Sequence, residues 1–172
     1  MITRRKTQSK KTLSRKFRVK ISPIIDIEPR PRHLENWMKN YCYHEPRRYW
    51  LGRVNIQTNC RQWLHELQTK HSKTMPGYMI HEYLCANKSI KNCYDLSELL
   101  AIQKKGVAFF RKHFKGKKVF GWRGTVETMV GGCSVPYLYE SEGKVILSWS
   151  SLSNDWDQKC PALMYRKLEV RN

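Results

Sequence analysis

The spacing of hydrophobic residues divides the chain into a helical first part and a strand-like last part. Between residues 33 and 115, apolar side chains recur every three or four positions, which is the spacing of one helix face. The clearest series is Leu34, Trp37, Met38, Tyr41 and Cys42. This pattern predicts helices over residues 33–44, 59–70, 77–85 and 95–114, with an extended segment over residues 47–57.

Two local signals refine the longest of these predicted helices. Asp95 is followed three residues later by Glu98, and this pairing is typical of a capping box, in which each residue binds a backbone N–H of the first turn. Gly106 lies in the middle of the same helix, where glycine is less favourable than alanine by about 1 kcal/mol. We therefore expect a helix that begins after Asp95 and bends near Gly106.

Beyond Gly116 the hydrophobic period changes to two, which is typical of half-buried strands. Apolar and polar residues alternate between Phe120 and Val130. Further strands are expected over residues 135–139, 144–150 and 162–170, with turns at Gly131-Gly132 and over residues 140–143. Short strands joined by tight turns predict an antiparallel β-meander.

Together these elements predict an α+β fold, with a helical N-terminal half followed by a small antiparallel β-meander. Residues 1–32 are expected to form an extended basic arm and a proline-rich hinge. The prolines of this hinge are Pro23, Pro29 and Pro31. Residues 33–172 are expected to form a single domain, mainly helical over residues 33–115 and mainly β over residues 116–172.

The charge of the chain is strongly positive and unevenly distributed. There are 33 lysines and arginines against 14 acidic residues, which gives a formal net charge of +19 at pH 7. No acidic residue precedes Asp26, and none lies between Glu98 and Glu127, although both stretches are rich in lysine and arginine. Such dense positive charge favours a polyanionic partner, and the most abundant one in a cell is nucleic acid.

The residues expected to bind nucleic acid form three groups along the chain. Those of the arm are Arg4, Arg5, Lys6, Lys10, Lys11, Arg15, Lys16, Arg18 and Lys20. Those of the predicted extended segment are Arg47, Arg48, Tyr49 and Arg53. Those of the predicted long helix and the loop after it are Lys104, Lys105, Arg111, Lys112, Lys115, Lys117 and Lys118. Lysine and arginine bind phosphate, and an exposed aromatic ring or guanidinium group stacks on a splayed base.

This pattern favours a noncatalytic, RNA-binding structural protein without a cofactor. In composition and layout the chain resembles proteins of ribosomes and of other ribonucleoprotein or viral particles, which implies neighbouring proteins as further partners. A DNA-binding regulator is an alternative, although no glycine turn of a helix-turn-helix motif can be identified. RNA is therefore the preferred partner.

The arm has two other interpretations, which bear on localisation. A mitochondrial transit peptide is also rich in arginine and serine and poor in acids, and a solvated tail needs no partner at all. The six cysteines are widely spaced, with no CxxC pair, and this predicts reduced thiols in an intracellular, reducing compartment. A mitochondrion and a virion are the alternatives. No apolar run is long enough to cross a membrane.

One group of residues has the side chains of a possible metal site. His81, Cys85 and Cys93, with Cys60 as a fourth ligand, have side chains that suit Zn²⁺. Their spacing lacks the close cysteine pair of the common zinc motifs. No metal site is therefore expected.

One part of the chain resembles the ADP-ribosyltransferase family. The resemblance rests on Val-Phe-Gly-Trp-Arg-Gly-Thr at residues 119–125 and on Gly-Lys-Val-Ile-Leu-Ser-Trp-Ser-Ser-Leu-Ser at residues 143–153. It implies that Arg123 binds the phosphates of NAD and that Ser150 or Ser151 orders the site. The catalytic glutamate of that family lies on a later strand. The acidic residues that follow Ser153 here are Asp155, Asp157 and Glu169, so NAD binding is implied more directly than catalysis.

Overall fold

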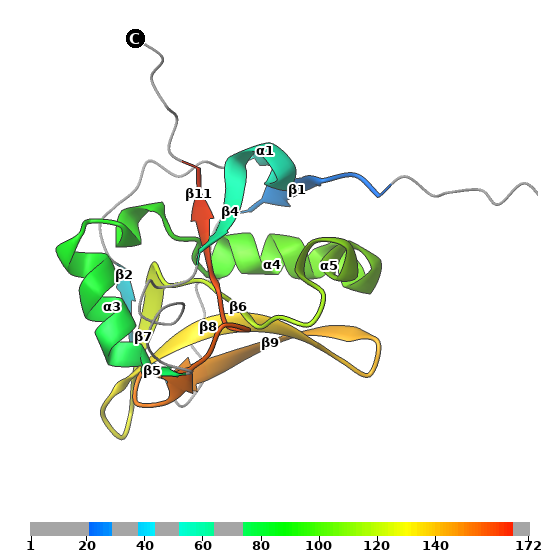
Figure 1. Cartoon of the computed structure of the whole chain (residues 1–172). Helices are drawn as coiled ribbons and strands as arrows, with labels where there is room; N and C mark the ends of the chain where they lie inside the picture. The colour runs from blue at the N-terminus through cyan, green and yellow to red at the C-terminus, as the bar shows by residue number, and fades with distance from the viewer. Residues whose placement is uncertain (1–20, 29–37, 44–51, 64–73, 167–172) are drawn as a thin grey trace, which may run out of the picture.

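Strands are distributed along the whole of the described chain, with the helices between them (Figure 1). The computed structural model describes residues 21–28, 38–43, 52–63 and 74–166. Its helices are α1 (Ile56–Asn59), α3 (Gly77–Ala86), α4 (Leu96–Lys104) and α5 (Gly106–Phe114), with a 3-10 turn, η1, at Ile90–Asn92. Its strands are β1 (Ile24–Ile27), β2 (Met38–Tyr43), β3 (Gly52–Asn55), β4 (Cys60–Trp63), β5 (Met75–Pro76), β6 (Val119–Phe120), β7 (Gly124–Thr128), β8 (Cys133–Ser141), β9 (Lys144–Ser151), β10 (Asp155–Trp156) and β11 (Ala162–Tyr165).

A mixed β-sheet forms the centre of the described structure. Seven strands take part in the order β2-β7-β8-β6-β11-β4, with β9 paired to β8 outside this path. The long strand β8 pairs with β7 near its start, with β6 near its middle and with β9 along its whole length. β6 and β11 run parallel, whereas the other pairs of this sheet are antiparallel. The sheet thus joins segments that are far apart in the sequence.

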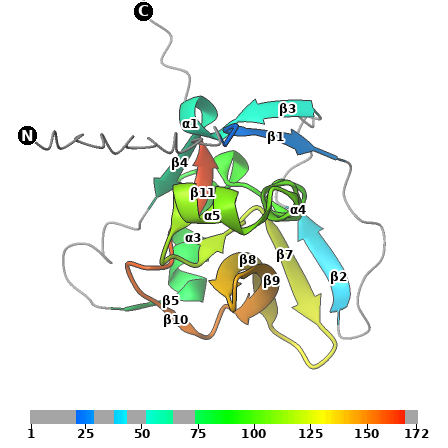
Figure 2. The same ribbon diagram turned by 90° about the vertical axis from the view of Figure 1, so that its right-hand side faces the viewer.

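Helices α4 and α5 form a layer between the β8–β9 hairpin and the β1–β3 pair (Figures 1 and 2). The three layers share one hydrophobic core. Strand β1 contributes Ile25, α4 contributes Leu99, α5 contributes Phe110 and β8 contributes Leu138, and none of these side chains is exposed. The segment assigned to the proline-rich hinge therefore supplies a buried strand to the body of the protein.

A second hydrophobic core lies against α3 and is built around two tryptophans. The rings of Trp122 and Trp156 are 5.5 Å apart between centroids, and both are buried with Leu84 of α3. Helix α3 begins at Gly77, where a Cβ atom would lie only 2.1 Å from Cζ3 of Trp156. The close approach of α3 to Trp156 therefore requires glycine at this position.

The local signals of the long predicted helix are confirmed. Asp95 Oδ1 accepts a hydrogen bond from the backbone N–H of Ser97 at 2.9 Å, and Glu98 Oε2 accepts one from the backbone N–H of Asp95 at 2.8 Å. Gly106 has φ of +76°, which the helix cannot accommodate. The expected bend is consequently a complete break, and the predicted helix consists of α4 and α5.

Two predicted helices are wrong where the structure describes them. Residues 38–43 form strand β2, which pairs with β7, and residues 60–63 form strand β4, which pairs with β11. Helical spacing over a short segment is compatible with either structure, and pairing to a distant strand decided between them. The partners of β4 lie about a hundred residues further along the chain, so no local pattern records them. Residues 33–37, 44 and 64–70 lie outside the described residues.

The predicted fold class is therefore wrong. Strands outweigh helices, and the helices do not form an N-terminal half. The last third is not a simple antiparallel meander either, because β6 and β11 are parallel. Parallel neighbours need a crossover connection, and the chain between these two strands passes through β7 to β10.

Other predicted elements of the last third are confirmed with changed limits. Gly131, Gly132 and Gly143 all have positive φ at the tips of the β7–β8 and β8–β9 hairpins, where turns were expected. The expected strand after Gly116 is interrupted between β6 and β7. A Cβ at Gly121 would lie 3.1 Å from the backbone oxygen of Asp95 and 3.0 Å from Leu99 Cδ1, so the chain passes closely over the start of α4 there.

Candidate nucleic-acid interface

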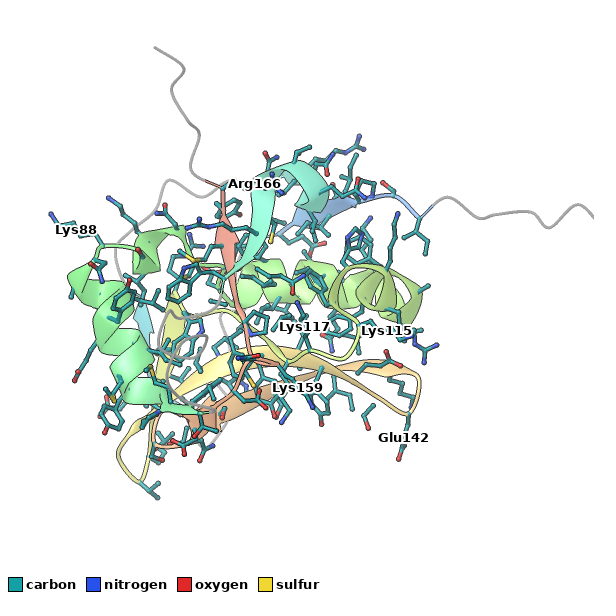
Figure 3. All side chains as sticks on the ribbon, viewed as in Figure 1. Lys88, Lys115, Lys117, Glu142, Lys159 and Arg166 are labelled. Atoms are coloured by element: carbon teal, nitrogen blue, oxygen red, sulfur yellow. The ribbon has the colours of Figure 1, made fainter. Side chains whose placement is uncertain are left out.

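A basic groove lies where the C-terminal end of α5 meets strand β8. Its cavity has a volume of about 600 Å³. The residues that line it, and that define the basic groove below, are Arg111, Lys115, Gly116, Lys117, Lys118, Tyr139 and Glu140. Figure 3 shows the labelled Lys115 and Lys117 between α5 and the β8–β9 hairpin. Four of the seven lining residues are thus cationic.

The way in which α5 ends explains the position of these cations. Helix α5 ends at Phe114, and Gly116 follows with φ of +73°, a conformation that glycine adopts without strain. The last turn of the helix carries Arg111 and Lys112, where positive charge favourably meets the negative end of the helix dipole. The chain then turns sharply, so that residues 115–118 form one wall of the groove.

The loop over residues 115–118 is held to two neighbouring segments. The backbone N–H of Lys118 donates to the carbonyl oxygen of Lys159 at 2.8 Å. Lys117 Nζ donates to Gln62 Oε1 at 2.7 Å, and Gln62 Nε2 in turn donates to the carbonyl oxygen of His113 at 2.9 Å. Strand β4, which the sequence predicted as a helix, therefore fixes the loop of the groove to the end of α5.

One acidic residue lies in the groove, and it is already paired. Arg111 Nε donates to Glu140 Oε1 at 2.8 Å, and this bond with Arg111 lowers the pKa of the Glu140 carboxyl. Lys115 and Lys118 are exposed and take part in no ion pair within the described residues. The groove therefore keeps an excess of positive charge.

His113 does not add to this charge at neutral pH. Partial burial, together with the charge of Lys112, lowers the pKa of its imidazole below the usual value of 6.5. The ring packs against Phe109, with 4.6 Å between ring centroids. His113 is consequently neutral and belongs to the core side of α5.

A row of aromatic rings leads from the core to the groove. The rings of Phe120 and Tyr137 are stacked at 4.9 Å, and those of Tyr137 and Tyr139 follow at 5.5 Å. Phe120 is buried, whereas Tyr137 and Tyr139 are half-buried. Lys118 Nζ lies 5.8 Å from the centre of the Tyr137 ring, within the range of a cation–π contact.

A second cavity of about 380 Å³ adjoins the basic groove, because both are lined by Gly116 and Lys118. Its other lining residues are Thr74, Asp155, Asp157, Lys159 and Cys160. Burial raises the pKa of the Cys160 thiol to about 11, so this cysteine is protonated at neutral pH. Asp155 and Asp157 bring negative charge to this cavity, so the cationic surface ends there.

The structure brings together four of the cations predicted to bind nucleic acid and separates the others. Arg111, Lys115, Lys117 and Lys118 line the basic groove. Lys112 Nζ instead donates to the carbonyl oxygen of Ile21 at 2.9 Å. The point at which residues 1–20 join the body is therefore next to the basic end of α5.

The remaining predicted cations that the structure describes lie elsewhere. Lys104 is paired with Glu28 at 2.6 Å, and Arg53 with Asp26 at 3.5 Å. Lys105 is exposed at the break between α4 and α5. The predicted residues that lie outside the described part of the chain are Arg4, Arg5, Lys6, Lys10, Lys11, Arg15, Lys16, Arg18, Lys20, Arg47, Arg48 and Tyr49.

Sequence reasoning missed three residues of this surface. Tyr137 and Tyr139 are predicted only as members of a strand, and Lys159 has no predicted role. The signal for the two tyrosines is their spacing. They stand two residues apart in one strand, so both lie on the same face of the sheet. Only the packing of the 115–118 loop against residue 159 brings Lys159 to the surface.

Arg123, the residue that the ADP-ribosyltransferase resemblance assigns to NAD phosphates, lies inside the protein. Its side chain is 3% exposed, and its NH2 group binds Asp95 Oδ2 at 2.7 Å and Glu98 Oε1 at 3.0 Å. Tyr165 also donates to Glu98 Oε1, at 2.9 Å. Burial, together with the neighbouring Asp95, raises the pKa of Glu98 to about 7. We call Arg123, Asp95, Glu98 and Tyr165 the buried cluster.

Ser150 and Ser151 make local hydrogen bonds at the end of β9. Asn154 Nδ2 donates to Ser150 Oγ at 3.1 Å, and the hydroxyls of Ser151 and Ser153 are 2.8 Å apart. These bonds stabilise the turn between β9 and β10. They belong to a different hydrogen-bond network from that of Arg123.

The described ranges contain neither a group of metal ligands nor a helix that could span a membrane. Within them, no three histidine, cysteine or acidic side chains form a group that could hold a metal ion. Cys85 Sγ lies 4.0 Å from both ring nitrogens of His81. Cys93 follows η1, is buried, and forms an isolated β-bridge with Met164 of β11. Burial raises the pKa of Cys60 to about 11. No helix in the same ranges is long and apolar enough to cross a membrane.

Comparisons with known proteins found no family model that matches this chain. The searches among curated proteins and among solved structures found no match either.

Proposed function

We propose that this protein is a noncatalytic RNA-binding protein that contacts the phosphate backbone through the basic groove. The observation that carries the proposal is the convergence of Arg111, Lys115, Lys117 and Lys118 on one cavity, where Glu140 is already paired with Arg111. Cations that are exposed, close together and short of acidic partners repel each other. A polyanion relieves that repulsion and gains affinity by releasing its own counterions.

The sequence outside the described residues supports the same partner. The nine cations of residues 1–20 are followed by Ile21, whose carbonyl oxygen binds Lys112 in α5. A strand of RNA bound along the end of α5 would therefore be within reach of the arm. Membership of a ribosome-like or viral ribonucleoprotein particle is the setting that this arrangement favours.

RNA is preferred to duplex DNA because aromatic rings accompany the cations. Tyr137 and Tyr139 lie beside Lys118, and such combinations are typical of sites for unpaired bases. A DNA-binding regulator would instead present a helix to the major groove. The hydrophobic face of α5, with Phe109, Phe110 and Phe114, is committed to the core.

The NAD-binding alternative stays a prediction. The ion pairs of Arg123 with Asp95 and Glu98 give it no support, because a phosphate would have to replace two buried carboxylates. Binding of labelled NAD that depends on Arg123 would be the direct test.

The experiment that tests RNA binding compares two pairs of lysines by fluorescence anisotropy. In the first variant, Lys115→Gln and Lys118→Gln remove two cations of the basic groove. In the matched control, Lys88→Gln and Lys91→Gln remove two exposed cations that do not line the groove, and Lys88 lies far from Lys115 in Figure 3. Both variants therefore have the same net charge.

The groove variant is expected to bind single-stranded RNA about tenfold more weakly and to lower the slope of log K against log salt by about 1.4. The control is expected to change both quantities little. Equal affinities for the wild type and the groove variant would overturn the proposal. Competition with duplex DNA decides between RNA and DNA, because tighter binding of the duplex would favour the regulator.

A further inference from the structure

The row of aromatic rings that starts in the core ends at a ring that lines the basic groove. Phe120, Tyr137 and Tyr139 form successive pairs with ring centroids 4.9 and 5.5 Å apart and interplanar angles of 26° and 30°. Such angles are nearer to stacking than to edge-to-face packing. The row starts at a buried ring on β6 and ends at Tyr139 on β8, which lines the groove.

Strand pairing holds this row in place. Phe120 is directly opposite Tyr137 in the β6–β8 ladder, and Tyr139 follows two residues later on the same face of β8. In the β8–β9 ladder, Tyr139 is paired with Ile146 on the neighbouring strand. Both tyrosines are therefore set by the backbone of the sheet rather than by a loop, which makes the final ring a preorganised platform.

The surroundings of the final ring contain the charges that a nucleotide needs. Lys115, Lys117 and Lys118 line the same cavity as Tyr139. The cavity volume of about 600 Å³ is large enough for a nucleotide and lies in the range of small-ligand sites. Lys118 also lies over the Tyr137 ring, so that cation and aromatic row are adjacent.

We propose that Tyr139 stacks an unpaired base of single-stranded RNA, while Lys115 and Lys118 bind the phosphates on either side of it. This inference rests on the proposed RNA-binding function and names the form of RNA that the groove takes. In a duplex the faces of the bases are covered by their neighbours, so a stacking platform can engage only an unpaired base. Stacking accepts every base, so the platform selects single strands without reading sequence.

The test uses Tyr139→Leu, which removes the platform and keeps an apolar side chain. As a matched control, Tyr78→Leu makes the same change at an exposed tyrosine of α3. The probes are a ten-nucleotide oligoadenylate and a ribose-phosphate oligomer of equal length without bases. Tyr139→Leu is expected to bind oligoadenylate about tenfold more weakly and to bind the abasic oligomer like the wild type. Tyr78→Leu should leave both affinities unchanged.

A spectroscopic measurement separates stacking from a structural effect. An oligouridylate with 2-aminopurine at its centre is bright when free, because uridines stack weakly, and it loses fluorescence when that base stacks on a ring. Binding to the wild type and to Tyr139→Trp is expected to quench it, and binding to Tyr139→Leu is not. If Tyr139→Leu fails to fold, Tyr139→Trp still decides, because absence of quenching with both the wild type and this variant would overturn the inference.

The two proposals fail in different ways. If Tyr139→Leu binds oligoadenylate as tightly as the wild type while Lys115→Gln with Lys118→Gln binds more weakly, the stacking site is wrong and RNA binding through the groove stands. If the lysine variant also binds like the wild type, both proposals are wrong. A preference of the wild type for duplex RNA over oligoadenylate would overturn the single-strand inference alone.

Discussion

The buried cluster and the basic groove both contain several charged side chains, but they differ in whether those charges are enclosed with opposite ones or exposed beside like ones. In the cluster, Arg123 is enclosed with Asp95 and Glu98, and its NH2 group lies 2.7 and 3.0 Å from their carboxyl oxygens. In the groove, Lys115 and Lys118 are exposed beside other cations. The cluster therefore joins α4 to the β6–β7 connection and β11, whereas the groove leaves charge available to a partner. The exposed cations of the groove are therefore the ones that the proposed RNA would meet.

The largest expected effect is on stability, when the buried cluster is broken. Asp95→Ala removes one carboxylate from Arg123 and also the N-cap of α4. We expect a loss of about 3–5 kcal/mol in the free energy of unfolding, because the guanidinium group stays buried with less compensation. Urea unfolding measures the change.

The matched control for this variant is an exposed ion pair. Asp26→Ala breaks the pair with Arg53, in which both side chains are more than half exposed, and should cost no more than about 1 kcal/mol. A loss below 1 kcal/mol for Asp95→Ala would contradict a structural role of the cluster. The folded fraction of either variant should bind RNA like the wild type, since neither residue lines the groove.

The next largest effect is expected on RNA affinity, when the arm is removed. Deletion of residues 1–20 removes nine cations, so we expect about hundredfold weaker binding at low salt and a clearly smaller salt slope. Anisotropy titrations at several salt concentrations measure both quantities. A full-length chain with those nine residues changed to glutamine controls for length and should behave like the deletion. A salt slope equal to that of the wild type would exclude a role of the arm.

A pH-dependent effect on stability is expected from the titration of Glu98. Burial raises the pKa of this carboxyl from 4.5 to about 7 in the folded protein. Between these two values the unfolded chain releases the proton and the folded chain keeps it, so ionisation favours unfolding. The contribution of Glu98 to stability is therefore complete below pH 4.5, falls as the pH rises to about 7, and is constant above.

Unfolding free energies between pH 4.5 and 7.5 measure this contribution. Glu98→Gln should remove it, so that the difference between wild type and variant changes across that range. His113 contributes with the opposite sign, because its lowered pKa costs stability as the pH falls below 6.5, but this part is common to both proteins. Glu140→Gln is the control, because its lowered pKa places its titration below pH 4.5. A constant difference between Glu98→Gln and the wild type would contradict the prediction.

Local chemistry predicted some elements of this fold, and distant pairing decided the others. The capping box at Asp95 and the glycine turns depend on neighbours within a few residues, and the sequence predicts them correctly. Gly106 was predicted to bend one long helix, and the structure has a break there instead. Strands β2 and β4 depend on β7 and β11, which lie far along the chain. Helical spacing in these short segments is consistent with both structures, so pattern alone could not choose.

The candidate site was likewise predicted in part by the local sequence and decided in part by distant contacts. The run of lysines and arginines between residues 104 and 118 was expected to be one surface. The break at Gly106 and the pairing of Lys104 with Glu28 leave its second half, from Arg111 to Lys118, as the groove. Tyr139 reaches the groove through strand pairing, which spacing in the sequence does not reveal. The charge run therefore shows where cations lie along the chain, but not which of them share one surface.

The smallest expected effect compares a paired lysine with an unpaired one. Lys104→Gln and Lys115→Gln change the net charge equally, but Lys104 is bound to Glu28 at 2.6 Å and lies outside the basic groove. We expect Lys104→Gln to change the free energy of unfolding by no more than about 0.5 kcal/mol and RNA affinity by less than about twofold, whereas Lys115→Gln should lower the salt slope by about 0.7. Anisotropy and urea unfolding measure the two quantities for both variants. If both weaken RNA binding equally, the protein responds to net charge alone. Unequal effects would mean that the groove, and not the overall charge of +19, determines where the phosphates bind.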